Sequence, residues 1–391
     1  AGAAVRTKTP SCSLTGDPNA NGCGAAANVD QWGAGDNGDL NYKKGKPFST
    51  YVSATSELLL TMPGQGLKFM ARGTGMYDFM AKNTERTQLT SDAQQQIVYN
   101  AQLLDLWAQK DFTIANRNSH LRLGNQVINW GESMYATGGI NATNSLDYQK
   151  LVIPGTQLKQ AVLPAPMLSF AADLSHGVST EAYYQFMWNG NRFPPVGSYW
   201  SVSNVLGRGT EPFTVNPNNF NVNGPSAGTI AGMTGQNAHD PATLNAISNG
   251  LVNGEFANSF GLPVYNRLPS KYKPQFGVKF NYVPRTIDAN FAFYYENYTD
   301  KSPVLTSFAN NTLQWSNPAN RQLFGVSANF PLGPWAIGTE LSYRPRDAVA
   351  LSSCYGAGGP PDLNVNPGGV DCQQWADKKK FQFGINGLLA L

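Results

Sequence analysis

Hydrophobic and polar residues alternate with a period of two along a series of extended segments. In QFGVKFNY, for example, Phe276 and Phe280 face one way and Lys279 the other. This alternation predicts β-strands with one apolar and one polar face. The segments are about ten residues long, which is enough to cross a bilayer when a strand is tilted, whereas soluble strands average closer to about five or six. We predict eleven strands, at residues 50–62, 67–80, 102–112, 121–130, 167–175, 178–188, 275–285, 288–298, 320–330, 334–346 and 380–391.

The connections between these segments are of two kinds. SHGVST, PRTID and FPLGPW are tight turns, whereas residues 189–274, 298–318 and 347–376 are long, polar and rich in glycine, asparagine and proline. Short turns at one end and long loops at the other are the layout of an outer-membrane barrel. Aromatic residues near segment ends, such as Tyr282 and Trp335, fit the belts found at membrane interfaces.

The predicted fold is therefore all-β: a transmembrane antiparallel up-and-down β-barrel of about 12–16 strands when complete, with long extracellular loops. Because single-chain bacterial barrels have an even number of strands, eleven segments predict at least one more. The sequence ends at Leu391 without a terminal aromatic residue, so we also expect terminal residues beyond those given. The alternative is a secreted β-sandwich, but the second face is too rich in Gly, Ser, Asn and isolated charge for a packed core.

Composition supports this prediction and excludes other classes. The 391 residues are 41% hydrophobic and only 14% charged, and the mean hydropathy is −0.32. No run approaches the roughly 20 apolar residues of a spanning helix. The net charge of +3, with no basic cluster longer than Lys378–Lys380, is weak for binding nucleic acid, so no nucleic-acid partner is expected. The first residues, AGAAVRTKTPSC, lack a charged region followed by an apolar one, so a signal peptide is expected to be either absent or already removed.

The four cysteines form two local pairs within loop-like sequence. Cys12 and Cys23 bracket one stretch, and Cys354 and Cys372 another. Spacings without a CxxC motif favour two loop-closing disulfides formed outside the cytoplasm over a zinc site. We therefore divide the chain into an N-terminal loop region with a disulfide, residues 1–49, and a transmembrane barrel, residues 50–391. The barrel includes a plug segment at 138–166 and a long extracellular loop at 189–274.

The segment LRLGNQVINWGES stops alternating partway along. Asn125 falls on the apolar face, and a polar and apolar mixture follows from Gly138 to Pro166, broken by prolines and glycines. A surface loop is one interpretation. We favour the other, in which this plug segment folds into the barrel and its apolar residues narrow the lumen. Trp130 then packs at a hinge, and Glu132 is expected to anchor Arg122 or Lys150.

Polar residues opposite the aromatic faces are expected to face the lumen, because Arg or Lys at mid-bilayer costs about 2–4 kcal/mol. Both charge signs occur, so the residues form either a bracing network or a path for a polar solute. Bracing is the safer interpretation for any single residue. The predicted lumen and constriction residues are Arg72, Asp105, Arg122, Gln126, Trp130, Glu132, Asp147, Lys150, Lys159 and Glu181.

Catalytic motifs are lacking. The chain has only three histidines, and no GxSxG, HExxH or Walker motif occurs. Ser175 and His176 are adjacent on a predicted short turn, which leaves a lipid-acting barrel enzyme as a weak alternative. The stretch from Gly35 to Gly45 resembles a calcium loop but lacks the bidentate glutamate, so a polar turn is favoured. We predict no enzyme activity, no cofactor and no metal.

Several linked motifs carry a family resemblance. GDNGDLNYKKG, LRLGNQVINWGES, GIN and LDYQKLVIPGTQLKQAVLPAPML follow one another from about residue 35 to 190. Together they resemble the DUF1302 family of Gram-negative outer-membrane proteins. The resemblance implies a barrel in the bacterial outer membrane. It also implies neighbours that include a periplasmic DUF1329-type protein and an RND-type, MmpL-like exporter. No catalytic residue is carried over from the family.

These observations predict an outer-membrane channel or transporter for hydrophobic or amphipathic small molecules or lipids. The expected partners are the lipid bilayer, lipopolysaccharide and such a solute, with the periplasmic protein and the exporter implied by the resemblance. The alternative is a structural or docking component of a lipid-export system that has no solute path of its own.

Overall fold

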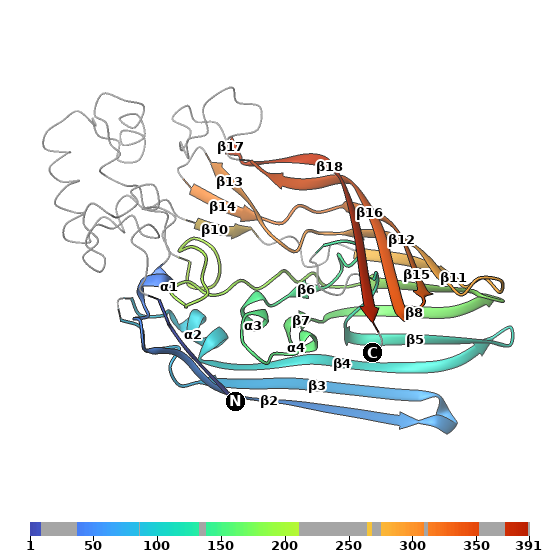
Figure 1. The fold of residues 1–391 in the computed structure, drawn as a ribbon, viewed down its shortest axis with the longest axis horizontal. Coiled ribbons are helices and arrows are strands. Elements are labelled where there is room, and N and C mark those ends of the chain that lie inside the picture. Colours follow the sequence, from blue (N-terminus) through green and yellow to red (C-terminus); the bar gives the residue numbers. More distant parts are fainter. Residues whose placement is uncertain are drawn as a thin grey trace, which may run out of the picture.

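The computed structural model describes residues 1–8, 37–85, 87–132, 138–210, 264–267, 275–308, 312–351 and 372–389. One antiparallel twelve-stranded sheet dominates these residues, and each strand pairs with the next along the chain, apart from short excursions. Figure 1 shows this sheet as a long curved wall. Its strands, in order, are β1 (Gly2–Val5), β2 (Pro47–Met62), β3 (Leu67–Asp78), β4 (Tyr99–Ile114), β5 (Arg117–Gln126), β8 (Ala165–Ser175), β9 (Val178–Gln185), β11 (Gln275–Tyr282), β12 (Asn290–Tyr298), β15 (Arg321–Leu332), β16 (Trp335–Ala350) and β18 (Trp375–Leu389).

The predicted all-β, up-and-down antiparallel architecture is confirmed. All eleven predicted segments are strands of this sheet, and β1 is the additional one. Within the described residues, the sheet ends at β1 on one side and at β18 on the other, with no hydrogen-bond ladder between them. Closure into a ring therefore remains a prediction.

The two faces of the sheet differ as the alternation predicts. Large apolar side chains are exposed on the outer face, including Leu58 (55%), Phe293 (55%) and Phe383 (66%). The opposite, concave face carries polar and charged groups, several of them fully buried, such as Glu296 (0%). A wall that exposes large apolar groups on one side and buries carboxylates on the other is the reverse of a soluble sheet packed on an apolar core.

The two ends of the sheet also differ. At one end the strands are joined by tight turns, such as Ala115–Asn116 between β4 and β5, where both residues have left-handed φ angles of 52° and 59°. At the other end lies the helix α2 (Ser91–Ile97). The Thr90 side chain caps it by accepting the Ala93 N–H.

A second sheet lies at the long-loop end. It is formed by β10 (Val264–Arg267), β14 (Thr312–Ser316), β13 (Val304–Phe308) and β17 (Cys372–Gln373), so the predicted long loops contain strands of their own. The short helix α1 (Asn37–Leu40) and the 3₁₀ turn η5 (Pro63–Gln65) complete the elements of the first three strands. No helix in the described ranges is long and apolar enough to span a membrane.

The predicted disulfides cannot be placed. Cys12, Cys23 and Cys354 lie outside the described residues, and only the backbone of Cys372, in β17, is described. Most of the predicted loop 189–274 and of the N-terminal region 1–49 also falls outside them. The disulfides and these domain boundaries stay predictions.

Between β5 and β8 the chain leaves the wall as an insertion, residues 127–164, of which 133–137 are not described. The wall ends at Gln126, not at Trp130 as predicted, and resumes at Ala165, so the predicted plug segment 138–166 extends two residues into β8. The insertion contains β6 (Ser145–Leu146), α3 (Tyr148–Leu151), α4 (Leu158–Ala161) and β7 (Val162–Leu163). Figure 1 shows these elements between the β2–β5 part of the wall and the β12–β18 part.

The polar residue on the apolar face of β5 has a local cause. The β3–β4 register shifts between Ala71 and Gly73, so β4 is bulged near Leu104. The Asn125 side-chain amide donates to the Leu104 carbonyl across the β4–β5 pair. A bulge interrupts the ladder, and the carbonyl that it leaves without a ladder partner needs another donor. Asn125 supplies that donor.

Candidate functional site

The candidate site is the concave face of the sheet together with the insertion that crosses it. The first part of the insertion packs through Trp130, which is 4% exposed. Its ring centroid lies 5.0 Å from that of Tyr183 and 5.9 Å from that of Tyr294, and its Nε1 donates to Glu181 Oε2 at 2.9 Å. Lys279 pairs with the other oxygen of Glu181 at 3.1 Å. Trp130 is therefore held by β9, β11 and β12 at once.

Glu132 does not anchor Arg122 or Lys150, and that prediction is wrong. Its Oε1 accepts the Asn329 side chain of β15 at 3.2 Å, and its carbonyl accepts the Asn386 side chain of β18. Its backbone N–H donates to Glu340 Oε2 of β16 at 2.8 Å. Glu132 thus attaches the insertion to strands β15, β16 and β18, which lie 197 to 254 residues further along the chain.

Buried hydrogen bonds continue this attachment beyond Glu132. Glu340 Oε1 accepts the Ile140 N–H at 3.4 Å, and Arg344 donates to the Gly139 carbonyl at 2.5 Å. Further along, Thr143 donates to Glu296 Oε2 at 2.7 Å and lies 2.6 Å from the Tyr183 hydroxyl. Buried polar groups are costly unless paired, so residues 128–132 and 138–144 and this part of the wall satisfy each other's hydrogen-bonding groups.

Glycines in the wall provide room for the insertion. A Cβ at Gly277 would lie 2.7 Å from the Trp130 ring, and one at Gly325 would lie 2.8 Å from Ile140 Cγ1. Side chains at these positions would collide with the insertion, because atoms in packed interiors do not approach this closely. The concave face is thus shaped to receive the first part of the insertion.

The second part of the insertion begins at Asp147. Its side chain caps α3 by accepting the Lys150 N–H at 3.2 Å, and it lies 3.9 Å from the Arg192 guanidinium. Lys150 and Arg192 both donate to Gln102 Oε1 of β4, at 3.2 and 2.9 Å. Burial raises the pKa of Asp147 and lowers the pKa of Lys150. Each of these buried groups therefore relies on the other members of the cluster to stabilise its charged form.

The end of the insertion reaches β2. Lys159 pairs with Glu57 at 2.6 Å, and Glu57 lies 3.8 Å from Arg72, which also pairs with Asp105. The series of charges runs from the exposed Lys159 (46%) to the nearly buried Asp105 (11%). Three predicted lumen residues, Arg72, Asp105 and Lys159, thus lie together with their partner Glu57 at the β2–β4 part of the wall.

Two predicted residues, Arg122 and Gln126, bond to neighbouring strands of the wall. Arg122 donates to Gln109 Oε1 at 2.9 and 2.7 Å and lies over the Trp107 ring at 4.2 Å. Gln126 donates to the Met167 carbonyl at 3.0 Å and accepts the Ser169 hydroxyl at 2.9 Å, and so ties β5 to β8.

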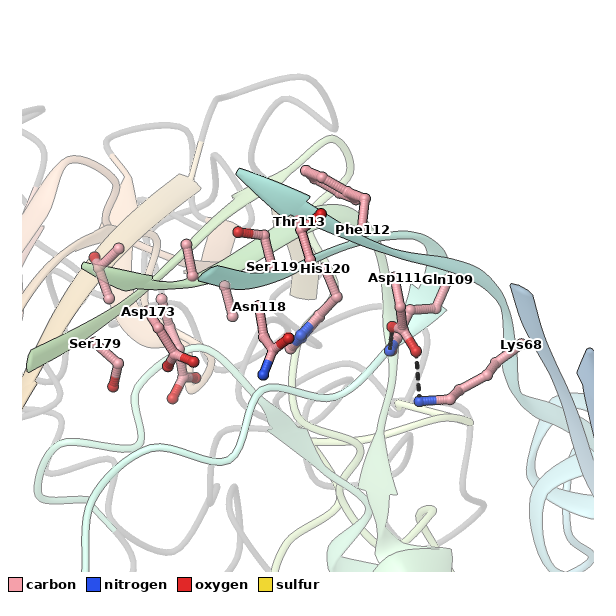
Figure 2. Close-up of a pocket in the computed structure, with 14 residues that line it drawn as sticks. Lys68, Gln109, Asp111, Phe112, Thr113, Asn118, Ser119, His120, Asp173 and Ser179 are labelled. Carbon is pink, nitrogen blue, oxygen red and sulfur yellow. Dashed lines mark hydrogen bonds and ion pairs between the residues drawn. The ribbon is translucent and has the colours of Figure 1, made fainter. Parts of the chain in front are cut away.

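A hollow of about 630 Å³ lies on the turn side, lined by β3, β4, β5, β8 and β9. Figure 2 shows its lining: Lys68 is paired with Asp111 at one end, while Asn118, His120 and Asp173 project into the middle. A second hollow of about 620 Å³ shares Asn118 and Asp173 and continues to the turns. Together they form a polar space open to water.

Sequence reasoning missed several residues that hold the insertion: Gln102, Thr143, Tyr183 and Arg192. Glu296, Glu340 and Arg344 stand on the polar face of predicted strands, so alternation gave their direction but not their partners. Gln102 and Arg192 carry no sequence signal. In the described ranges no group of three or more His, Cys, Asp or Glu side chains forms a metal site. His176 lies in the β8–β9 turn, and the absence of enzyme activity stays a prediction.

Comparisons with known proteins give a family and distant structural likenesses. The copper transporter OprC resembles the chain with a TM-score of 0.25 and 12% sequence identity, over 75% of this chain and 37% of OprC. The chain therefore matches well under half of that protein's length. No curated protein sequence matches it. The model of the family described as "Protein of unknown function (DUF1302)" matches residues 1–390, and the chain belongs to that family.

Proposed function

We propose that this protein is an outer-membrane channel for small amphipathic or hydrophobic molecules, narrowed by its own insertion. One observation carries the proposal. The insertion bonds to β2 through Lys159 and to β18 through Glu132, so it lies across the concave face between the two sides of the sheet. If the sheet closes into a barrel, the insertion narrows its lumen, while the hollows remain at the turn end of the strands.

The outer face supports a place in the membrane. On β4 the outward positions from Tyr99 to Ala108 carry no charge, and the next one outward is Lys110, whose ammonium group reaches the Gln65 carbonyl at the turn end. Ten residues rising about 3.3 Å each and tilted by about 40° span about 25 Å, which is the apolar band of outer-membrane barrels. The orientation proposed is long loops outward, with lipopolysaccharide and phospholipid as neighbours.

The concave side supports an amphipathic solute. Beside the Glu57–Lys159 pair, three leucines on the inner side are exposed: Leu59 (54%), Leu151 (41%) and Leu158 (56%). Apolar groups beside charged ones suit a molecule that has both kinds of surface. A purely ionic solute gains nothing from these leucines.

Planar-bilayer recording and liposome efflux test the proposal. The wild-type protein is expected to give a small, interrupted conductance and to release an amphipathic fluorescent dye faster than glucose of similar size. A large, steady and unselective current from the wild-type protein contradicts a bore narrowed by the insertion. Equal efflux of the two solutes contradicts the proposed substrate class.

A second candidate is a docking component of an export system with no solute path. The observation that favours it is mutual pairing: Arg72–Asp105, Lys279–Glu181 and Arg321–Asp377 leave few charges of the concave face available to a solute. Co-purification with a periplasmic DUF1329-type protein or an RND-type exporter, together with no solute flux in any variant, would favour this candidate over the channel.

A further inference from the structure

The two parts of the insertion are held very differently. Residues 128–132 and 138–144 are fixed by bonds between buried groups, such as Thr143 to Glu296, where both residues are less than 5% exposed. Residues 151–160 contact β2 through groups that water reaches. The Lys159 and Glu57 side chains are 46% and 37% exposed, and the Tyr51 hydroxyl donates to the Pro154 carbonyl at an exposed site.

Releasing the two parts has different consequences. Moving residues 128–132 and 138–144 away from the wall takes from the buried Glu296, Glu340 and Arg344 the hydrogen bonds that the insertion supplies, which is costly. Moving residues 151–160 away from β2 breaks the exposed Lys159–Glu57 pair, the exposed Tyr51–Pro154 hydrogen bond and the partly buried Gln160–Thr55 hydrogen bond, and water can replace them. Exposed ion pairs contribute little and are screened by salt.

Pro154 and Gly155 separate α3 from α4, so residues 151–160 have no continuous helix to keep them rigid. Leu151 and Leu158, on either side of this break, are 41% and 56% exposed. The buried Asp147 and Lys150, of which Lys150 donates to Gln102 of β4, mark the end of the firmly held part.

We propose that residues 151–160 form a gate, and that the Lys159–Glu57 ion pair is the latch that holds this gate against β2. The proposal rests on the proposed channel and assigns its regulation: the latched gate closes the β2 side of the bore, and its release opens that side. Salt weakens the latch, so opening depends on ionic strength. The Debye length falls from about 10 Å at 0.1 M to about 3 Å at 1 M salt.

The test removes the latch from each side. Glu57→Gln and Lys159→Met both break the ion pair, but only Glu57→Gln also removes a neighbour of Arg72. If the latch is the cause, both variants give the same effect and the double variant adds nothing. Glu85→Gln is the matched control, because it breaks the Lys43–Glu85 pair, which has a similar length of 2.8 Å and similar exposure but lies away from the insertion.

Hydrogen–deuterium exchange of the detergent-solubilised protein measures the gate directly. In both latch variants, amides of residues 151–160 are expected to exchange roughly two- to fivefold faster, the range for loss of one exposed ion pair, with residues 139–146 unchanged. Bilayer recording is expected to show an increase of the same size in open probability. In 1 M salt the wild-type protein is expected to behave like the variants.

The outcomes separate the two proposals. Unchanged exchange at 151–160 in both latch variants, or a change of equal size in Glu85→Gln, overturns the latch whatever the current does. Faster exchange without any change in opening, in a protein whose wild type conducts, overturns the gate. Faster exchange in a protein that never conducts in any variant or salt overturns the channel itself.

Discussion

Replacing Asn125 with leucine makes the outer face of β5 more hydrophobic, and we expect it to destabilise the protein. In the wild-type structure the Asn125 amide donates to the Leu104 carbonyl at the β4 bulge. Leucine cannot donate, so this carbonyl is left without that partner in a wall that faces lipid. A buried polar group without its partner costs about 1–3 kcal/mol.

The opposing gain is smaller. Placing leucine in the membrane contributes about 0.3–0.6 kcal/mol on the insertion scale. The net expectation is therefore a loss of about 1–2 kcal/mol in the free energy of unfolding. Equilibrium unfolding in urea, followed by tryptophan fluorescence in detergent or lipid vesicles, measures it through the midpoint at constant slope.

The control makes the opposite replacement, asparagine for leucine, two residues away on β5. Leu123→Asn places an amide on the same outer face at a position that is 54% exposed and has no bulge opposite. If hydrophobicity alone governs this face, Asn125→Leu stabilises and Leu123→Asn destabilises. If the carbonyl at the bulge decides, both variants destabilise. A variant Asn125→Leu as stable as the wild type, or more stable, refutes the reasoning.

Three further predictions concern the insertion and its surroundings. Gly325→Val is expected to displace Ile140, whose Cγ1 lies 2.8 Å from the added Cβ, and to raise single-channel conductance; Gly73→Ala, whose nearest atom is at 3.6 Å, should not. Glu340→Leu leaves two backbone N–H groups without their acceptor, and should lower the unfolding free energy by about 2–4 kcal/mol in urea titrations. Burial lowers the pKa of Lys301 from 10.5 to about 7. Between these values the unfolded chain binds more protons than the folded one, so the free energy of unfolding rises with pH across that window. Lys301→Met should remove this rise, which amounts to at most a few kcal/mol, in urea titrations at pH 7 and 10.

The wall was predictable because its signal is local. Each strand repeats one physical rule, apolar outward and polar inward, over about ten residues, and the rule is visible without knowing the neighbours. The strand β1 was missed because Gly2–Val5 is only four residues long and has no charged face to alternate with. The wall's end at Gln126 was misplaced because Val127 and Ile128 continue the apolar pattern, although their backbone has already left the sheet.

The partners within the site were not predictable in the same way. Glu132 was assigned to charges close to it in the sequence, Arg122 and Lys150, but binds Asn329 and Asn386. The direction of each polar side chain follows from alternation, whereas its partner follows from the register of strands that lie far apart in the chain. A shift of one residue in that register turns every side chain to the other face.

A closed barrel built on this sheet would need the insertion, because its wall side chains could not fill the interior. About eight strands leave an interior just wide enough for side chains, and the described sheet already has twelve. Some inward polar groups pair within the wall, as Arg72 does with Asp105, and others take partners from the insertion. Residues 128–132 and 138–144 supply such partners for Glu340, Glu296 and Arg344, and so cannot leave without taking hydrogen bonds from buried charges. Residues 151–160 bond to β2 through contacts that water can replace, so any opening of the channel that preserves the fold must begin there.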